Sequence, residues 1–109
     1  MITNKTFEIK IAIDYFNNQG TLSSFDEQYS LNKIAEIMLP IVIKYGGYTI
    51  TKGLGSYYHK EKGIVTHLNT FILTINTFST EEGIPEEIEE IGKKLAEAFN
   101  QKEVLINIS

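Results

Sequence analysis

The residues best suited to binding or chemistry gather in one stretch of the sequence. Tyrosines, histidines and lysines recur between positions 48 and 69, and the candidate binding residues are Tyr48, Lys52, Tyr57, Tyr58, His59, Lys60, His67 and Asn69. Tyrosine and histidine rings stack on flat ligands, and lysine neutralises phosphate. A cleft here would suit a nucleotide-like ligand or a protein loop, although the same mixture also occurs on exposed hairpins that bind nothing.

The two histidines offer little for metal or acid-base chemistry. A turn over residues 60–66 would bring His59 and His67 together, but zinc takes three or four protein ligands and the nearest carboxylate is Glu61. Either imidazole can act as a general base near neutral pH, yet no serine or aspartate stands at a spacing typical of a catalytic triad. We therefore predict no metal site, no cofactor and no assigned catalytic residue.

The composition excludes several classes of protein. The 109 residues contain no cysteine, which excludes a disulfide framework, a thiolate metal site and a thiol nucleophile. They contain no arginine and carry a net charge of −4, which disfavours nucleic-acid binding. No signal-like apolar region and no run of ~18 apolar residues is present, so we expect a cytoplasmic protein that does not enter a membrane.

Two glycines interrupt the candidate stretch. The run GLGSYY over residues 53–58 begins like a dinucleotide-binding fingerprint, but it lacks the third glycine and opens a hairpin instead of a helix. Glycines inside a strand indicate a β-bulge or a close approach of another backbone. We interpret Gly53 and Gly55 in that way.

Period-two alternation of apolar residues predicts the strands. Residues 7–13 alternate as a half-buried strand, and residues 48–52 and 65–78 are the extended arms of a long hairpin. Between the first strand and the first helix, residues 14–29 are rich in turn-forming side chains. We expect a surface loop there, held by Leu22 and Phe25, and a functional role for it is left open.

Two helices complete the chain. Ser30 can cap a first helix that runs to Tyr45 before Gly46-Gly47 ends it, with a kink at Pro40, where a proline inside a helix costs ~3 kcal/mol. The alternative ends this helix at Leu39 and makes residues 41–45 a strand. A second helix begins at Pro85 and presents one apolar stripe, and residues 104–108 form the last strand.

The order of elements predicts the fold class. The chain reads β-α-β-β-α-β, a single α+β domain over residues 1–109 with a ferredoxin-like antiparallel sheet, two helices on one face, and the first and third strands at the centre. The opposite face would carry Lys10, threonines and asparagines. A sheet open on one side is often covered by a second subunit, so we expect a homo-oligomer.

A short pattern links the chain to a group of known proteins. The segment Gly46-Gly47-Tyr48-Thr49-Ile50, then Gly53, Gly55 and Tyr57, and finally residues 100–104 before a terminal strand resemble small bacteriophage and mobile-element proteins. The resemblance covers about the last two-thirds of the chain. It implies a setting of host–phage conflict, in which small proteins inhibit a host defence protein or sequester its nucleotide signal.

Three functions follow from these observations. The leading interpretation is a non-enzymatic phage inhibitor that occupies the surface of a host defence protein through the tyrosine-rich hairpin. The alternative is a protein that binds or sequesters a nucleotide-like small molecule, with Lys52 or Lys60 near phosphate. The third is a small enzyme that uses His59 or His67 as a general base.

Overall fold

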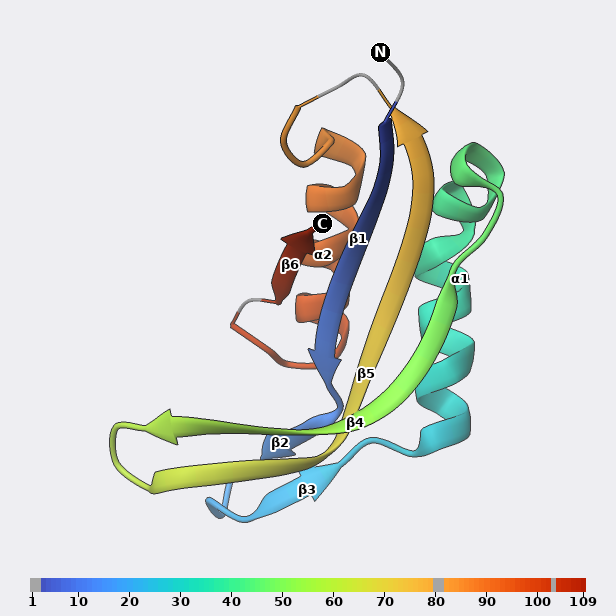
Figure 1. Cartoon of the computed structure of the whole chain (residues 1–109). Coiled ribbons are helices and arrows are strands. Elements are labelled where there is room, and N and C mark those ends of the chain that lie inside the picture. The colour runs from blue at the N-terminus through green and yellow to red at the C-terminus, as the bar shows by residue number, and fades with distance from the viewer. Residues whose placement is uncertain (1–2, 80–81, 103) are drawn as a thin grey trace.

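The computed structural model describes residues 3–79, 82–102 and 104–109. They form β1 (Thr3–Ala12), β2 (Asp14–Phe16), β3 (Leu22–Ser24), α1 (Glu27–Tyr45), β4 (Thr49–His59), β5 (Gly63–Ser79), α2 (Glu86–Ala98) and β6 (Leu105–Ile108). All strand pairs are antiparallel. The α+β class with two helices beside an antiparallel sheet is therefore confirmed (Figure 1).

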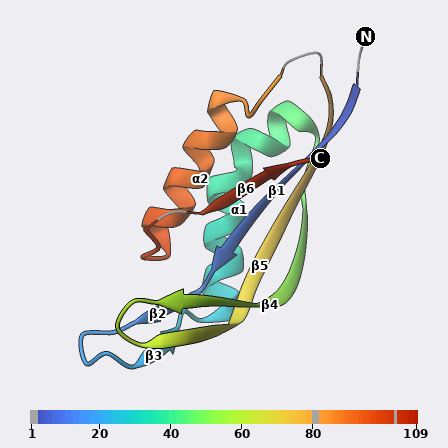
Figure 2. The same cartoon turned by 60° about the vertical axis from the view of Figure 1, so that its left-hand side comes forward.

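A four-stranded sheet in the order β4-β5-β1-β6 forms the body of the molecule. Its centre is the pairing of β1 with β5, which runs from Thr3 opposite Ser79 to Ala12 opposite Thr70. Both helices pack on one face of this sheet (Figure 2). The sheet is only part of the architecture, because a separate β2–β3 hairpin follows β1 and the β4–β5 pair continues well beyond β1.

The core lies between the sheet and the helices. Alternate residues of β1 and β5 and the inward stripes of α1 and α2 build it, together with Ile13 after β1 and Phe99 after α2: Phe7, Ile9, Ile11, Ile13, Ile34, Met38, Ile41, Phe71, Leu73, Ile75, Ile88, Ile91, Leu95 and Phe99. Full burial of one such side chain contributes roughly 1.5–3 kcal/mol. Lys10 lies exposed on the opposite face of the sheet, as the alternation predicts.

Helix α1 starts earlier than predicted and continues through Pro40. Asp26 caps it by accepting a hydrogen bond from the Tyr29 N–H at 2.9 Å, so the prediction of Ser30 as the cap is wrong. The Ser30 hydroxyl instead donates to the Asp26 carbonyl at 2.7 Å. The helix ends at Gly46, whose φ of 92° is the left-handed conformation that glycine favours. The alternative strand over residues 41–45 is therefore wrong.

The expected loop over residues 14–29 is also corrected, because most of it is a hairpin. Strands β2 and β3 pair from Asp14 opposite Ser24 to Phe16 opposite Leu22. The turn between them is organised by Asn17, whose side-chain oxygen accepts from the N–H groups of Gln19 and Thr21, each at 3.0 Å. Asparagine side chains often close a turn in this way, so a segment rich in turn-forming residues can be an ordered hairpin and not a loop.

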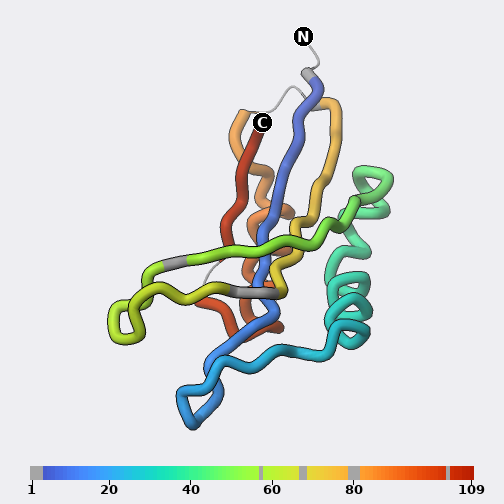
Figure 3. The backbone as a smooth tube through the Cα atoms, turned by 60° about the horizontal axis from the view of Figure 1, so that its bottom comes forward, coloured from blue at the N-terminus to red at the C-terminus, as the bar shows by residue number. Residues whose placement is uncertain are grey.

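Strands β4 and β5 extend past the sheet as a curved projection, which we call the arm (residues 54–69). The register shifts between Gly53 and Gly55, which confirms the predicted bulge. Beyond it β5 has no β1 partner, since that pairing ends at Thr70. The arm bends toward the β2–β3 hairpin (Figure 3). It gives the molecule an elongated shape of 51 × 27 × 21 Å.

Within the described residues, neither α1 nor α2 combines the length and the apolar composition that crossing a membrane requires.

Candidate functional site

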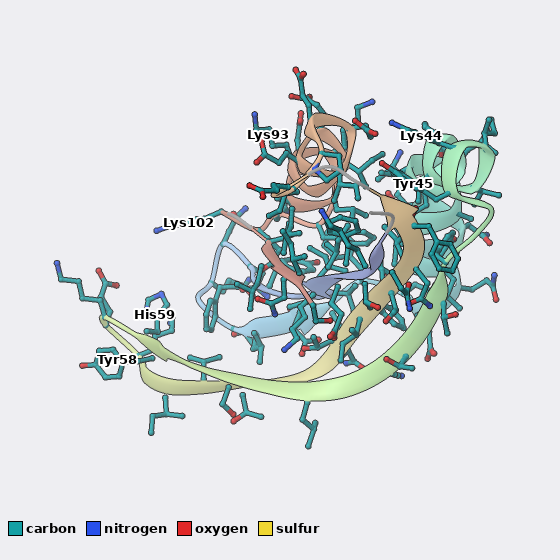
Figure 4. The ribbon with its side chains drawn as sticks, turned by 45° about the horizontal axis from the view of Figure 1, so that its top comes forward. Lys44, Tyr45, Tyr58, His59, Lys93 and Lys102 are labelled. Carbon is teal, nitrogen blue, oxygen red and sulfur yellow. The ribbon has the colours of Figure 1, made fainter. Side chains whose placement is uncertain are left out.

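The candidate residues of β4 are spread along the strand instead of meeting in one cleft. Tyr48, just before β4, packs against the core, and burial raises the pKa of its phenol. Lys52 forms an ion pair with Glu27 of α1, with 3.2 Å between Nζ and Oε2. His59 lies seven residues further along, about 23 Å at the usual rise of a strand. Figure 4 shows Tyr58 and His59 at the tip of the arm, far from the end of α1.

The polar groups at the arm tip mainly hold the arm together. His59 Nδ1 accepts hydrogen bonds from the N–H groups of Glu61 and Lys62, at 3.1 and 3.2 Å, which closes the turn. The His59 ring meets Phe16 of β2 edge-on, with 5.4 Å between centroids. The Lys62 ammonium lies 4.8 Å from the Phe16 ring and donates to the Gly20 carbonyl at 3.1 Å. These contacts fasten the arm to the β2–β3 hairpin.

The predicted pairing of the histidines is wrong. The register places Gly63 opposite His59 and Gly55 opposite His67, so the two histidines are not cross-strand neighbours. The side chains of Tyr57 and His67 lie outside the part of the chain that the structure describes. Among the described residues, no group of three or more histidine, aspartate or glutamate side chains is placed to hold a metal ion.

The outward face of the arm tip is apolar. Tyr58 and Ile64 are cross-strand partners and are 75% and 79% exposed. Leu54 is also largely exposed. Lys60, between the strands, is exposed at the turn. Tyr58 and Lys60 are thus both accessible at the tip of the arm.

A buried carboxylate joins the arm to the rest of the molecule. Asp14 is 2% exposed, and its side chain accepts hydrogen bonds from the Ser24 hydroxyl and from Asn69, through the backbone N–H at 3.2 Å and Nδ2 at 3.1 Å. The Gln101 side chain donates to the Asp14 carbonyl at 3.0 Å. We call these four residues the Asp14 cluster. Of the candidates predicted from sequence, only Asn69 belongs to it.

The sequence carried a partial signal for this cluster. Asp14 directly follows the alternating apolar run of β1, where a polar residue starts the turn-rich segment. Its burial could not be read from that position, because the contacts come from residues 10, 55 and 87 positions away.

A shallow hollow lies between α2 and β6. It is a groove of about 510 Å³ lined by Glu89, Gly92, Lys93, Ala96, Glu97, Gln101, Lys102, Val104 and Ile106. Gly92 and Ala96 are buried in its floor, beside the half-buried Val104 and Ile106. The charged residues are exposed at its rim, and Figure 4 shows Lys93 and Lys102 on the side of α2 that faces away from α1. This groove, which we call the α2–β6 groove, was not predicted from the sequence.

A second charged group ties the two helices together. Both the Lys44 ammonium and the Tyr45 hydroxyl donate to Oε1 of Glu87, the hydroxyl at 2.7 Å. The Lys44 hydrogen bond, followed by that of Tyr45, lowers the pKa of Glu87 from its ordinary 4.5 to about 2. Burial and the bond to Glu87 raise the pKa of Tyr45. All three groups are engaged with one another, which indicates a structural role.

Comparison with protein-family models and with curated proteins finds no match. Among solved structures, the fold is similar to a phage SAM lyase in complex with S-methyl-5'-thioadenosine, with a TM-score of 0.68 and 17% identity over 97% of this chain and 80% of that one. A phage SAM lyase in the apo state gives a TM-score of 0.66 and 16% identity over 96% and 78%. At this level of identity the likeness shows the fold alone.

This likeness overturns the leading interpretation of the sequence. A non-enzymatic inhibitor that covers a host protein with its tyrosine-rich hairpin is not what the comparison supports, because both similar solved structures are of a phage SAM lyase. The structure with a bound nucleoside thioether agrees better with the alternative, a nucleotide-like small-molecule ligand. The resemblance to phage proteins that the sequence showed is supported at the level of the fold, because a phage protein shares it.

Proposed function

We propose that this chain binds S-adenosylmethionine (SAM) and cleaves it as a lyase. The single observation that supports the proposal is the extent of the structural similarity, which covers 97% of this chain and 80% of a SAM lyase that holds S-methyl-5'-thioadenosine (MTA). A fold hosts many functions, so the chemistry has to be tested on this chain itself.

The reaction that converts SAM into MTA breaks one carbon–sulfur bond. The bond between the sulfonium sulfur and the γ-carbon of the amino-acid part gives its electron pair to sulfur, which becomes the neutral thioether. The γ-carbon of the four-carbon fragment then either forms a bond to the fragment's own carboxylate oxygen, which closes a lactone, or forms a double bond to the β-carbon as a β-proton passes to water. Such a step depends on holding the substrate in a reactive conformation and on stabilising changing charge.

Two expectations from the sequence belong to this proposal. The four-stranded sheet, with β1 and β5 at its centre, supports a ferredoxin-like arrangement of the body, with the β2–β3 hairpin outside that sheet. A homo-oligomer, expected from the open sheet face, is supported by the exposed apolar side chains of Leu54, Tyr58 and Ile64 on the arm.

Product analysis tests the lyase activity. Purified chain is incubated with SAM, and MTA is quantified by liquid chromatography and mass spectrometry. We expect MTA to form at a rate proportional to protein concentration and above the rate in heat-unfolded controls. S-adenosylhomocysteine should stay intact, because without the sulfonium charge sulfur is a poor leaving group. MTA formation at the background rate across all protein concentrations would contradict the proposed activity.

Sequestration of SAM without cleavage is the second candidate function. The observation that favours it is the S-methyl-5'-thioadenosine bound in the similar structure, because a shared fold can keep a ligand site without keeping the chemistry. Sequestration predicts that free SAM falls in step with added protein and that intact SAM is recovered on unfolding. Recovery of MTA instead would exclude it.

A further inference from the structure

We infer that the outward face of α1 binds the same face of a second copy of this chain. Four exposed apolar side chains lie on that face in the second half of the helix, and we call them the α1 stripe: Ala35, Leu39, Val42 and Ile43. The inference goes beyond the proposed function, because it concerns neither the ligand nor the reaction. It also uses a different surface from the arm and from the open face of the sheet, since both helices lie on the other face of that sheet (Figure 2).

The α1 stripe is an apolar surface that faces solvent. Leu39, Val42 and Ile43 are 55%, 37% and 78% exposed, and Ala35 is exposed beside them. The opposite side of the same helical turns is buried in the core, so α1 is apolar on two sides here. The spacing of the stripe, at positions i, i+4, i+7 and i+8, is that of a helix face that packs on a partner. Exposed apolar patches of this kind mark interaction sites.

The first half of the same helix face is polar. Gln28 and Asn32 occupy it, and the Gln28 amide donates to the Asn32 side-chain oxygen at 2.9 Å. A partner that lay along the whole helix would have to cover these amides, which costs free energy unless it hydrogen-bonds them. The partner that fits is therefore one that crosses α1 around Leu39 and contacts only the second half.

A second copy of the chain meets this requirement because the α1 stripe is complementary to itself. In an antiparallel pair with Leu39 on the two-fold axis, Ala35 lies opposite Ile43 of the second copy, since both are four residues from Leu39. The smallest side chain of the stripe thus faces the most exposed one, and two-fold symmetry repeats the contact. Small residues opposite large ones let helix ridges fit into grooves.

The charges beside the α1 stripe select the antiparallel arrangement. The Glu36 and Lys44 side chains are 73% and 55% exposed. In the antiparallel pair, Glu36 and Lys44 of the second copy lie on the same flank, about 3 Å apart along the helix axis. Lys44 is held by Glu87, and its ammonium has two further N–H groups to donate. A parallel pair would place each charge beside its own kind.

Disulfide trapping tests the position of the two-fold axis. The chain contains no cysteine, so a single introduced cysteine reports on one position only. Leu39→Cys should give a cross-linked dimer on mild oxidation, because the two copies of this residue meet at the axis. The control Gln28→Cys lies on the same face, but its two copies would be about 33 Å apart and should not cross-link. Equal cross-linking of the two variants would overturn the antiparallel pair.

Charge insertion tests the apolar contact in the Leu39→Cys background. Ile43→Glu should lower the cross-linked fraction about tenfold, because it places an unpaired carboxylate in both halves of the interface. The matched control is Ile64→Glu on the arm, where the same type of side chain is 79% exposed, and it should leave the cross-linked fraction unchanged. Loss of cross-linking with Ile64→Glu but not with Ile43→Glu would move the contact to the arm and overturn the inference.

Native mass spectrometry of the wild-type chain purified from cells tests the identity of the partner. We expect an even number of chains, and half that number for Ile43→Glu. A single chain at every concentration would overturn the inference, and so would a different protein that the wild type retains and Ile43→Glu loses. None of these measurements involves SAM, so their outcome and that of the lyase assay are independent.

Discussion

The Asp14 carboxylate lies where the chain leaves the four-stranded sheet and enters the β2–β3 hairpin. Its side chain accepts from Ser24 and twice from Asn69, so one buried group connects β2, β3 and β5. A buried carboxylate is costly unless its oxygens are hydrogen-bonded, and it positions its donors when they are. The cluster therefore fixes the base of the arm relative to the sheet.

Replacing Asp14 should destabilise the fold substantially. Asp14→Ala leaves the two Asn69 donors and the Ser24 hydroxyl without their acceptor, and we expect the free energy of unfolding to fall by about 3 kcal/mol. The control Asp26→Ala removes the cap of α1 and should cost only about 1 kcal/mol. Urea denaturation followed by circular dichroism measures both. Losses of equal size would contradict the role given to the cluster.

Glu87 should make a small part of the stability depend on pH. Its folded-state pKa of about 2 lies below the ordinary 4.5, so its contribution is present above pH 4.5 and is lost as pH falls toward 2. The side chain is 35% exposed, so we discount the shift and expect Glu87→Gln to cost about 0.5 kcal/mol at pH 7.

Urea titrations between pH 2 and 7 test this expectation, with Glu86→Gln as the neighbouring control. The difference between Glu87→Gln and wild type should disappear near pH 2. A difference that persists at pH 2, or that Glu86→Gln reproduces, would show that Lys44 and Tyr45 do not act on Glu87 as described.

At the scale of elements, helix α2 and strand β6 meet more closely than any ordinary side chain would allow. Gly92 stands in the middle of α2, where a glycine costs up to ~1 kcal/mol relative to alanine. A β-carbon at this position would lie 2.9 Å from Ile106 Cδ1 and 3.1 Å from Val104 Cγ2, so the close packing of the helix leaves no room for a side chain. The same contact shapes the floor of the α2–β6 groove.

Gly92→Val should force α2 away from β6. The branched side chain would overlap Val104 and Ile106, and we expect the free energy of unfolding to fall by about 2–3 kcal/mol. Lys94→Val places the same side chain at an exposed position of the same helix and should cost no more than about 0.5 kcal/mol. Thermal and urea unfolding compare the two. Equal decreases in the free energy of unfolding for the two variants would contradict the tight packing of α2 on β6 at Gly92.

Local patterns predicted the long elements better than the short ones. The apolar stripe of α2 and the alternation of β1 and β5 were sufficient, because packing follows directly from their periods. Pro40 suggested an alternative in which the first helix ends at Leu39, but α1 continues through it over nineteen residues. The β2–β3 hairpin was missed because its strands are three residues each, too short to show alternation, and its turn is closed by the Asn17 side chain.

The whole molecule is a sheet-and-helix body with a curved arm attached at one end. Sequence reasoning placed the function on the arm, because tyrosines and histidines are concentrated there. The fold places Tyr48 and Lys52 at one end of β4 and His59 at the other, and it creates a hollow elsewhere, between α2 and β6. Residues that line a groove on two elements, such as Gly92 and Val104, become neighbours only through packing, so a sequence pattern cannot reveal them.

Calorimetric titration of the full chain with MTA tests the proposed ligand most directly. MTA has about 20 non-hydrogen atoms, and at roughly −0.3 kcal/mol per atom its binding free energy would be about −6 kcal/mol, which corresponds to a Kd of tens of micromolar. We predict saturable binding of one MTA per chain in that range, with guanosine as a control that does not compete. A folded chain that gives no saturable heat with MTA or SAM at millimolar concentration would contradict an adenosyl ligand for this protein.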